Sequence, residues 1–213
     1  MLDLLDKELE KRGHKFVRYA DDCNIYVKTQ KAGERVMESI SDFITRKLKL
    51  KVNKEKSAVG KPSKRKFLGF IIRKAKEVKI GISKESIKRI KDWIRKATAM
   101  TRGRSIETIM TQLSIYLGGW KSYYGHAETL STFKDLDGWI RRRLRCYILH
   151  QRGKGMAMYR ELMKRGISKD WSWSICWSSK GFWFLSNIKQ IRIAFQNKTL
   201  ATMGFRPLYN GNV

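Results

Sequence analysis

The sequence predicts an α+β fold that changes character along the chain, with a small antiparallel sheet and helices up to residue 81 and helices alone beyond it. Three observations lead to this prediction. Short apolar runs bounded by turn residues occur before residue 81. Apolar residues at helical spacing dominate the rest of the chain. The 213 residues are 42% hydrophobic, which is enough apolar material to build a core.

The first elements are expected to be a helix followed by a hairpin. Residues 2–12 alternate apolar and charged side chains at helical spacing, and Gly13 is a typical residue just beyond a helix end. Residues 16–20 and 24–28 are then predicted as two short strands joined through residues 21–23. This hairpin carries two acidic residues at its turn.

A second helix and two more strands are expected to complete the first domain, residues 1–81. Residues 34–48 place their apolar side chains on one side of a helix. Residues 52–59 and 67–72 are predicted as strands, separated by the loop 60–63.

The second domain, residues 82–150, is predicted to contain three helices. Ser83 and Ser105 are candidate N-caps for the first two, and the third is expected to follow Ser131. Residues 151–213 form a basic, aromatic-rich extension, for which nucleic-acid binding is one interpretation. The aromatic residues expected to form a small core in this extension are Trp171, Trp173, Trp177, Phe182, Trp183 and Phe184.

The charge of the chain points to a polyanionic partner. Forty-seven Lys and Arg stand against 19 Asp and Glu, which gives a formal net charge of +28. Such a charge repels itself unless a polyanion is near, so nucleic acid is the leading partner. An anionic membrane surface is the rival. Because no uninterrupted apolar run has spanning length and no signal-peptide segment is found, we expect a soluble intracellular protein with no membrane partner.

The adjacent carboxylates of Asp21 and Asp22 need a physical explanation, because like charges at contact distance repel each other. At a tight turn, at least one of them can project into a cleft and bind a divalent cation. Mg²⁺ prefers carboxylate and phosphate oxygens. Two such ions can activate an attacking hydroxyl and stabilise a departing pyrophosphate. On this pair alone, an ordinary hairpin with Asp-Asp at its turn is the commoner interpretation.

The residues around the pair favour the metal-binding interpretation. The segment 16–27 contains Tyr-Ala-Asp-Asp at 19–22 and resembles the active-site hairpin of reverse transcriptases, in the form common among group II intron enzymes. The string Leu-Lys-Val-Asn-Lys-Glu-Lys-Ser at 50–57 resembles the next palm motif, and Phe-Leu-Gly-Phe at 67–70 resembles the primer-grip motif. Because the three motifs follow the family's order, the first domain is expected to be a partial polymerase palm.

The resemblance implies a role for individual residues. Asp21 matches a catalytic metal ligand, and Asp22 matches its acidic neighbour at a two-Mg²⁺ site. Tyr19 and Ala20 would lie near the primer end and the incoming dNTP, and Lys56 would face the triphosphate. The residues that would support the primer's 3′ end are Phe67, Leu68, Gly69 and Phe70.

The resemblance also implies that two parts of the family's palm are missing from this chain. The family carries a third metal-binding aspartate on an earlier strand and holds template and nucleotide with a fingers region. The chain begins shortly before the hairpin, and Asp3 and Asp6 are poor replacements for that aspartate. We therefore expect that the chain alone does not polymerise DNA. A separate chain that supplies the fingers and the first palm aspartate is one expected partner.

The helical part carries a second resemblance. The strings Leu-Gly-Gly-Trp-Lys-Ser-Tyr-Tyr-Gly at 117–125 and Phe-Lys-Asp-Leu-Asp-Gly-Trp-Ile-Arg-Arg-Arg-Leu-Arg at 133–145 resemble two helices of the maturase-specific domain of group II intron proteins. The likeness extends over residues 105–155 and implies a helical thumb/maturase domain. Group II intron RNA and an RNA template–DNA primer duplex are the implied partners, in a bacterial cytoplasm or an organelle.

Basic residues of this helical part are candidates for contact with RNA. Arginine can grip phosphates through paired hydrogen bonds, and here arginines interleave with Trp139 and Tyr147 instead of forming a plain solvated run. Trp120 could stack on a base, but core packing is the commoner explanation. The candidate RNA-binding residues are Lys88, Arg89, Arg95, Lys121, Arg141, Arg142, Arg143 and Arg145.

Three functions follow from these observations. The first is a reverse transcriptase segment, an RNA-directed DNA polymerase once its missing parts are supplied. The second is a non-catalytic maturase module that grips intron RNA and assists splicing. The third, a general basic RNA-binding protein, is disfavoured because a phosphate binder gains nothing from an acidic pair.

Overall fold

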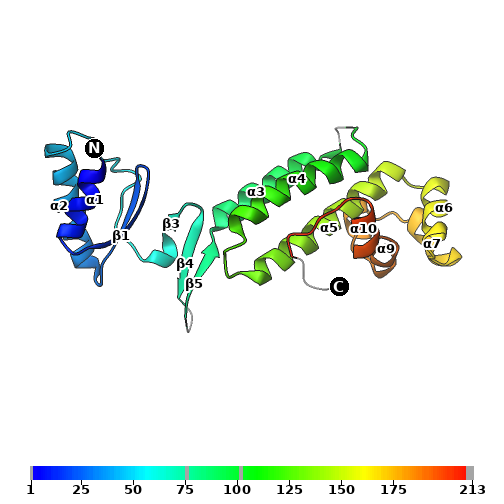
Figure 1. Ribbon diagram of the computed structural model, residues 1–213. Coiled ribbons are helices and arrows are strands. Elements are labelled where there is room, and N and C mark those ends of the chain that lie inside the picture. Colours follow the sequence, from blue (N-terminus) through cyan, green and yellow to red (C-terminus); the bar gives the residue numbers. More distant parts are fainter. Residues whose placement is uncertain (1, 75–76, 101–102, 210–213) are drawn as a thin grey trace. The chain divides into compact units, whose positions relative to one another are not determined.

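The computed structural model describes residues 2–74, 77–100 and 103–209. The chain divides into two compact units, Met1–Gly81 and Ile82–Val213 (Figure 1). The first unit is α+β and the second is helical apart from the end of one strand, so the predicted fold class is confirmed.

Two helices and a hairpin form the core of the first unit. Helix α1 (Leu2–Lys11) is followed by strands β1 (Lys15–Tyr19) and β2 (Asp22–Tyr26) and then by helix α2 (Gln30–Arg46). Gly13 ends α1 as predicted, with φ of 69°, where its N–H donates to the Glu10 carbonyl at 2.8 Å. The residues buried in this core are Leu5, Leu9, Ile40 and Leu48.

The first hairpin is tighter than predicted. β1 and β2 pair antiparallel out to Tyr19 and Asp22, so the connection is the two-residue turn Ala20-Asp21 and not residues 21–23. Asp22 is therefore the first residue of β2. Helix α2 also begins earlier than the expected residue 34, because the Thr29 side chain caps it by accepting the Ala32 N–H at 3.2 Å.

A second sheet follows a 3₁₀ turn (Pro62–Lys64) and has the order β3-β4-β5, formed by Lys66–Phe67, Phe70–Lys74 and Val78–Ile82. The single strand predicted for residues 67–72 is wrong.

The chain reverses at Leu68 and Gly69, with φ of 51° and 81°, so the Phe-Leu-Gly-Phe string is a hairpin turn. Positive φ at both central residues matches the right-handed twist of the flanking strands.

The strand predicted for residues 52–59 is also wrong. This stretch is irregular, with a turn at residues 54–56. The Asn53 side chain forms the turn by accepting the backbone N–H groups of Glu55 and Lys56, each at 3.2 Å. An asparagine that satisfies the following amides in this way competes with pairing in a sheet.

Three long helices run side by side in the second unit: α3 (Lys84–Ala97), α4 (Ile106–Tyr124) and α5 (Leu130–Arg152) (Figure 1). The predicted N-caps are confirmed. Ser83 accepts the Ser86 N–H at 3.1 Å, and Ser105 accepts the Thr108 N–H at 3.2 Å. Helix α5 begins at Leu130, slightly before the predicted start.

Five short helices follow in the described residues up to 209: α6 (Met156–Lys164), α7 (Lys169–Cys176), α8 (Phe182–Leu185), α9 (Lys189–Ala194) and α10 (Asn197–Thr202). α6 packs on α7, and both α6 and α8 contact α5.

The C-terminal segment is tied to α5 by Asp137, which is fully buried. Its Oδ1 accepts the Leu208 N–H at 2.9 Å and its Oδ2 accepts the Tyr209 N–H at 2.8 Å.

The prediction of a small aromatic core after residue 150 is wrong. Trp171, Trp173 and Trp177 are 52%, 55% and 57% exposed. Trp183 and Phe184 are exposed as well. The side chains that α7 buries are Ser172, Ile175 and Cys176. Among the described residues, no helix combines the length and the apolar character needed to cross a bilayer.

Candidate catalytic hairpin and nucleic-acid interface

The hairpin of β1 and β2 has one anchored face and one open face. Phe16, Cys23 and Ile25 point toward α1 and α2 and pack against the core of the first unit. Residues directly opposite each other share a face, so Tyr19 and Asp22 point away from that core. Tyr19 is 64% exposed. The two helices thus hold the hairpin from behind while its acidic end stays accessible.

Both acidic residues lie at the accessible tip of this hairpin. Asp21 and Asp22 are exposed, and Ala20 has a φ of 53°. Two-residue turns of this kind favour glycine or asparagine, because a side chain at positive φ costs about 1–2 kcal/mol. Ala20 therefore holds the turn in a strained conformation. The structure brings the four residues Tyr19, Ala20, Asp21 and Asp22 together at one turn, as the resemblance implied.

Arg18 fixes this turn from the anchored side. Its Nε donates to Asp6 Oδ1 at 2.6 Å, its Nη2 to Asp6 Oδ2, and its Nη1 to the Ala20 carbonyl at 2.8 Å. The hydrogen bond from Arg18 lowers the pKa of Asp6. Arg18 and Asp6 were missed as site residues. The sequence did contain a signal for this pair, because Arg18 is a charged residue at a strand position that faces the core.

The donor chemistry of the turn fits a magnesium ion. Two adjacent exposed carboxylates suit Mg²⁺, which proteins commonly bind with one or two carboxylates plus phosphate and water oxygens. Across residues 2–74, 77–100 and 103–209, no group of three or more His, Cys, Asp or Glu side chains could hold a metal ion.

The other palm candidates lie on two further turns of the first unit. Lys56 is exposed in the turn that Asn53 closes, and its carbonyl accepts Arg65 Nη2 at 3.4 Å. Leu68 and Gly69 form the turn between β3 and β4, flanked by the half-buried Phe67 and Phe70. Leu68 and Gly69 connect two strands of a different sheet from that of the acidic hairpin, and Lys56 lies outside both sheets.

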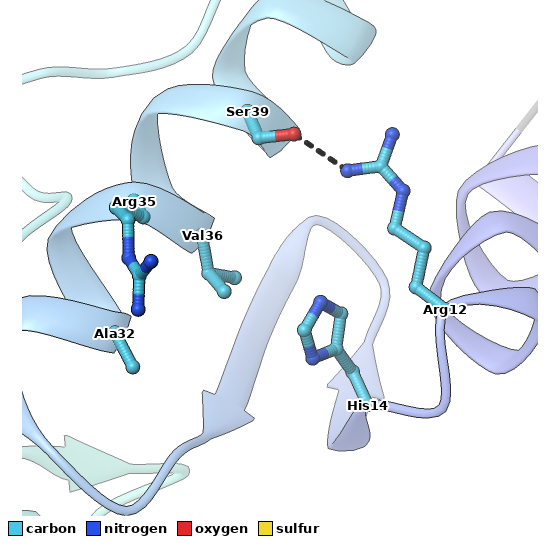
Figure 2. A pocket seen from close by; sticks show the side chains of 6 residues that line it. All are labelled: Arg12, His14, Ala32, Arg35, Val36 and Ser39. Atoms are coloured by element: carbon cyan, nitrogen blue, oxygen red, sulfur yellow. Dashed lines mark hydrogen bonds between the residues drawn. The ribbon is translucent and has the colours of Figure 1, made fainter.

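A hollow that the sequence did not indicate lies between the end of α1, His14 and α2 (Figure 2). Three of its lining residues, Arg12, His14 and Arg35, are basic groups. Arg12 is held in place because its Nη1 donates to Ser39 Oγ at 2.7 Å and its Nε donates to Glu8 Oε1 at 2.7 Å. This lining suits an anion and is separate from the acidic turn.

In the second unit, three cations surround one indole ring. Lys91 Nζ, Arg95 Cζ and Arg143 Cζ lie 5.7, 5.6 and 5.6 Å from the centre of the Trp139 ring. Arg143 Nε also donates to Thr98 Oγ1 at 2.8 Å, and burial lowers the pKa of Arg143. The ring stabilises these cations through its quadrupole, and their concentration on one surface of α3 and α5 suits a phosphate group.

Arg142 and Arg145 hold α8 against α5. Arg145 is only 7% exposed, and its Nε donates to the Ser186 carbonyl at 2.9 Å. Burial lowers the pKa of Arg145 to about 10. Arg142 Nη2 donates to the Trp183 carbonyl at 3.1 Å, and its guanidinium lies 4.0 Å from the Trp183 ring centre. The structure thus gives Arg145 an internal partner in place of the expected RNA phosphate.

The remaining candidates lie nearer the surface. Lys88 and Arg89 of α3 are exposed, and Lys121 and Arg141 are half-buried. Trp120 packs against the rings of Tyr124 and Phe133, with centroid distances of 4.6 and 5.7 Å, which agrees with the core interpretation of that tryptophan.

Two family models match this chain. Residues 1–72 match the reverse transcriptase (RNA-dependent DNA polymerase) model. Residues 87–166 match the model of the group II intron maturase-specific domain. A search among curated proteins returned no match.

The α+β unit with its acidic hairpin is therefore part of a reverse transcriptase palm, and the helical unit contains a maturase-specific domain. The chain belongs to the group II intron reverse transcriptase/maturases. Membership implies binding to intron RNA and to nucleic-acid substrates, in a family that uses Mg²⁺.

Proposed function

We propose that Asp21 and Asp22 of this chain act as metal ligands in RNA-directed DNA synthesis, while its helical unit binds group II intron RNA. The observation that supports the catalytic part is the geometry of the hairpin tip. Both carboxylates are exposed at a two-residue turn whose opposite face is packed on two helices and whose Ala20 carbonyl is held by Arg18. A ligand site needs this combination of access and rigidity.

Each residue of the tip has a distinct part in the proposal. Asp21 binds Mg²⁺ as the central residue of the turn, and Asp22 adds a second carboxylate from the first position of β2. Bound magnesium supplies activation of the primer hydroxyl and charge neutralisation of the leaving pyrophosphate. Tyr19, which shares a face with Asp22, contacts the primer end or the incoming nucleotide.

The proposed site is shared with other segments. A third carboxylate, which the family's palm carries on an earlier strand, and a fingers region would complete it. Lys56 would face the triphosphate, and the turn between β3 and β4 would support the primer's 3′ end. Gly69, at φ of 81°, permits the backbone approach that such support requires.

The RNA-binding part rests on the surface of α3 and α5 around Trp139. Lys91, Arg95 and Arg143 converge there, and the exposed Lys88 and Arg89 lie on the same helix α3. We propose that this surface binds the phosphates of intron RNA or of the template–primer duplex. Further contacts would come from Lys121, Arg141 and Arg142. Binding should weaken with salt by about 0.7–0.9 log units of affinity per contact for each tenfold rise in salt.

Primer extension tests the catalytic part of the proposal. The chain is mixed with a reverse transcriptase segment that carries the fingers and the first palm aspartate, and Mg²⁺-dependent extension of a DNA primer on an RNA template is measured. Asp21→Asn should lower the extension rate at least about a hundredfold, because it removes a metal ligand. Asp42→Asn is the matched control, since Asp42 is an exposed acid of the same unit and the charge change is equal.

The same variants separate the enzyme from the non-catalytic maturase module. If Asp21→Asn abolishes extension and leaves the affinity for intron RNA unchanged, the two parts of the proposal stand. If the complemented chain extends no primer while it still binds intron RNA, the module is the better description. Extension that survives Asp21→Asn would overturn the assignment of the metal ligand.

A further inference from the structure

Three aromatic rings, one half-buried on α6 and two exposed on and just after α7, follow one another in a row. The Tyr159 and Trp173 rings have a centroid distance of 6.1 Å, and the Trp173 and Trp177 rings a distance of 5.6 Å. Trp173 and Trp177 are more than half exposed. We call Tyr159, Trp173 and Trp177 the aromatic row.

The row is outside the core because of how α7 is oriented. The helix buries Ser172, Ile175 and Cys176, which lie on its inward side. Trp173 and Trp177 are four residues apart and therefore neighbours on one face of the chain around α7. Two adjacent indoles left in water are costly for a monomeric protein unless the surface has a partner.

The segment that carries the row is cationic, although the exposed Asp170 also lies on α7. Residues 151–213 contain eleven Lys and Arg but only two acidic residues. One of these acids, Glu161, is already paired, with Arg165 at 2.7 Å and Arg152 at 3.8 Å. Lys154 lies beside the row: its Nζ donates to the Ser178 carbonyl, one residue beyond Trp177. A partner of this surface is therefore expected to be anionic and to offer flat faces to the indoles.

We propose that the aromatic row is a stacking platform for unpaired nucleotides, with Lys154 near their phosphates. This proposal rests on the proposed nucleic-acid binding of the helical unit and specifies its substrate as single-stranded. Bases in a duplex are stacked on each other and do not offer their faces, whereas unpaired bases stack readily on aromatic side chains. A protein partner fits less well, because protein interfaces are depleted of lysine.

Binding of two matched RNA probes tests the platform. The probes are a labelled uridine oligonucleotide and a blunt RNA duplex with the same number of phosphates. The double substitution Trp173→Ala with Trp177→Ala should weaken oligonucleotide binding by about tenfold or more, as expected for lost stacking, and change duplex binding less than about twofold. The corresponding double Phe variant keeps aromatic faces and should recover most of the affinity.

Trp171→Ala is the matched control, because Trp171 lies on the same helix and is 52% exposed but is outside the row. It should leave both affinities unchanged. Equal losses for both probes, an equal loss with Phe and Ala, or no loss at all would overturn the proposal. A change from dimer to monomer in the double Ala variant, with oligonucleotide binding intact, would instead identify a protein interface.

The outcome is independent of the catalytic proposal. Oligonucleotide binding requires neither Mg²⁺ chemistry nor a primer, so it is measured without Mg²⁺ and without the segment that carries the fingers. If extension fails while the aromatic row behaves as expected, only the catalytic proposal is lost. If the tryptophan substitutions leave oligonucleotide binding unchanged while primer extension depends on Asp21, only the proposal of a stacking platform is rejected.

Discussion

Replacing Asp137 by alanine should release the C-terminal segment from α5 and destabilise the second unit. The carboxylate is fully buried and accepts two backbone N–H groups, at 2.9 and 2.8 Å. Hydrogen bonds to a charged group contribute about 1.5–3 kcal/mol each. Burial raises the pKa of Asp137, because desolvation of the carboxylate outweighs the two backbone hydrogen bonds that lower it.

The two amides also differ in what happens after the substitution. Leu208 is 2% exposed, so its N–H would remain buried without an acceptor, whereas the half-buried Tyr209 would leave its N–H partly open to water. We therefore expect Asp137→Ala to lower the free energy of unfolding by about 2–4 kcal/mol. Asp137→Asn should cost less, because its amide oxygen can still accept one of the two N–H groups.

Urea unfolding followed by tryptophan fluorescence measures this effect in the right place, since all seven tryptophans lie in the second unit. Asp135→Ala is the control, because Asp135 is exposed on the same helix and the charge change is identical. A free energy of unfolding within about 0.5 kcal/mol of the Asp135 control would refute the reasoning, because so small a change lies within the scatter of surface substitutions.

Two further predictions concern the acidic hairpin. Ala20→Gly should stabilise the first unit by about 0.5–1 kcal/mol. Glycine adopts the φ of 53° without strain, and this gain exceeds the extra conformational freedom that glycine loses on folding. Urea unfolding followed by circular dichroism checks this, and a loss of stability would contradict the strain argument. Arg18→Met should return the pKa of Asp6 to its ordinary range. Since Arg18 lowers that pKa in the folded state, the ion pair stabilises fully above the ordinary Asp pKa of about 3.9 and is lost as pH falls through the lower, folded value. Carboxyl chemical shifts of Asp6 across acid titration measure both values, and an unchanged Asp6 midpoint in the Arg18 variant would exclude this cause.

Features with local causes were predictable from the sequence. The N-caps Ser83 and Ser105 need only the first turn that follows them, and Gly13 needs only the end of its own helix. The motif at 19–22 was recognised because its chemistry and its turn lie within four consecutive residues.

Features that depend on distant neighbours were not predictable in this way. The segment 52–59 has strand-like composition, but a strand needs a partner, and Asn53 offered the backbone a nearer alternative. Nothing in the sequence distinguishes Arg145 from the other arginines of its helix. Its guanidinium nevertheless donates to the carbonyl of Ser186, which is 41 residues away in the chain. The tryptophans after residue 170 are expected to form a small core, but α7 buries Ile175 and Cys176 and leaves Trp171 and Trp173 exposed.

The short connection between β1 and β2 makes the two neighbouring acids unequal. Asp22 is locked into the ladder opposite Tyr19, whereas Asp21 belongs only to the bend. An extra residue inserted within β2 just after Asp22 would flip the following side chains to the other face, exposing Cys23 and Ile25 and driving Asn24 toward the helices. The length of this hairpin is thus constrained as tightly as its residue types. Related proteins should therefore differ here by substitutions and not by insertions or deletions.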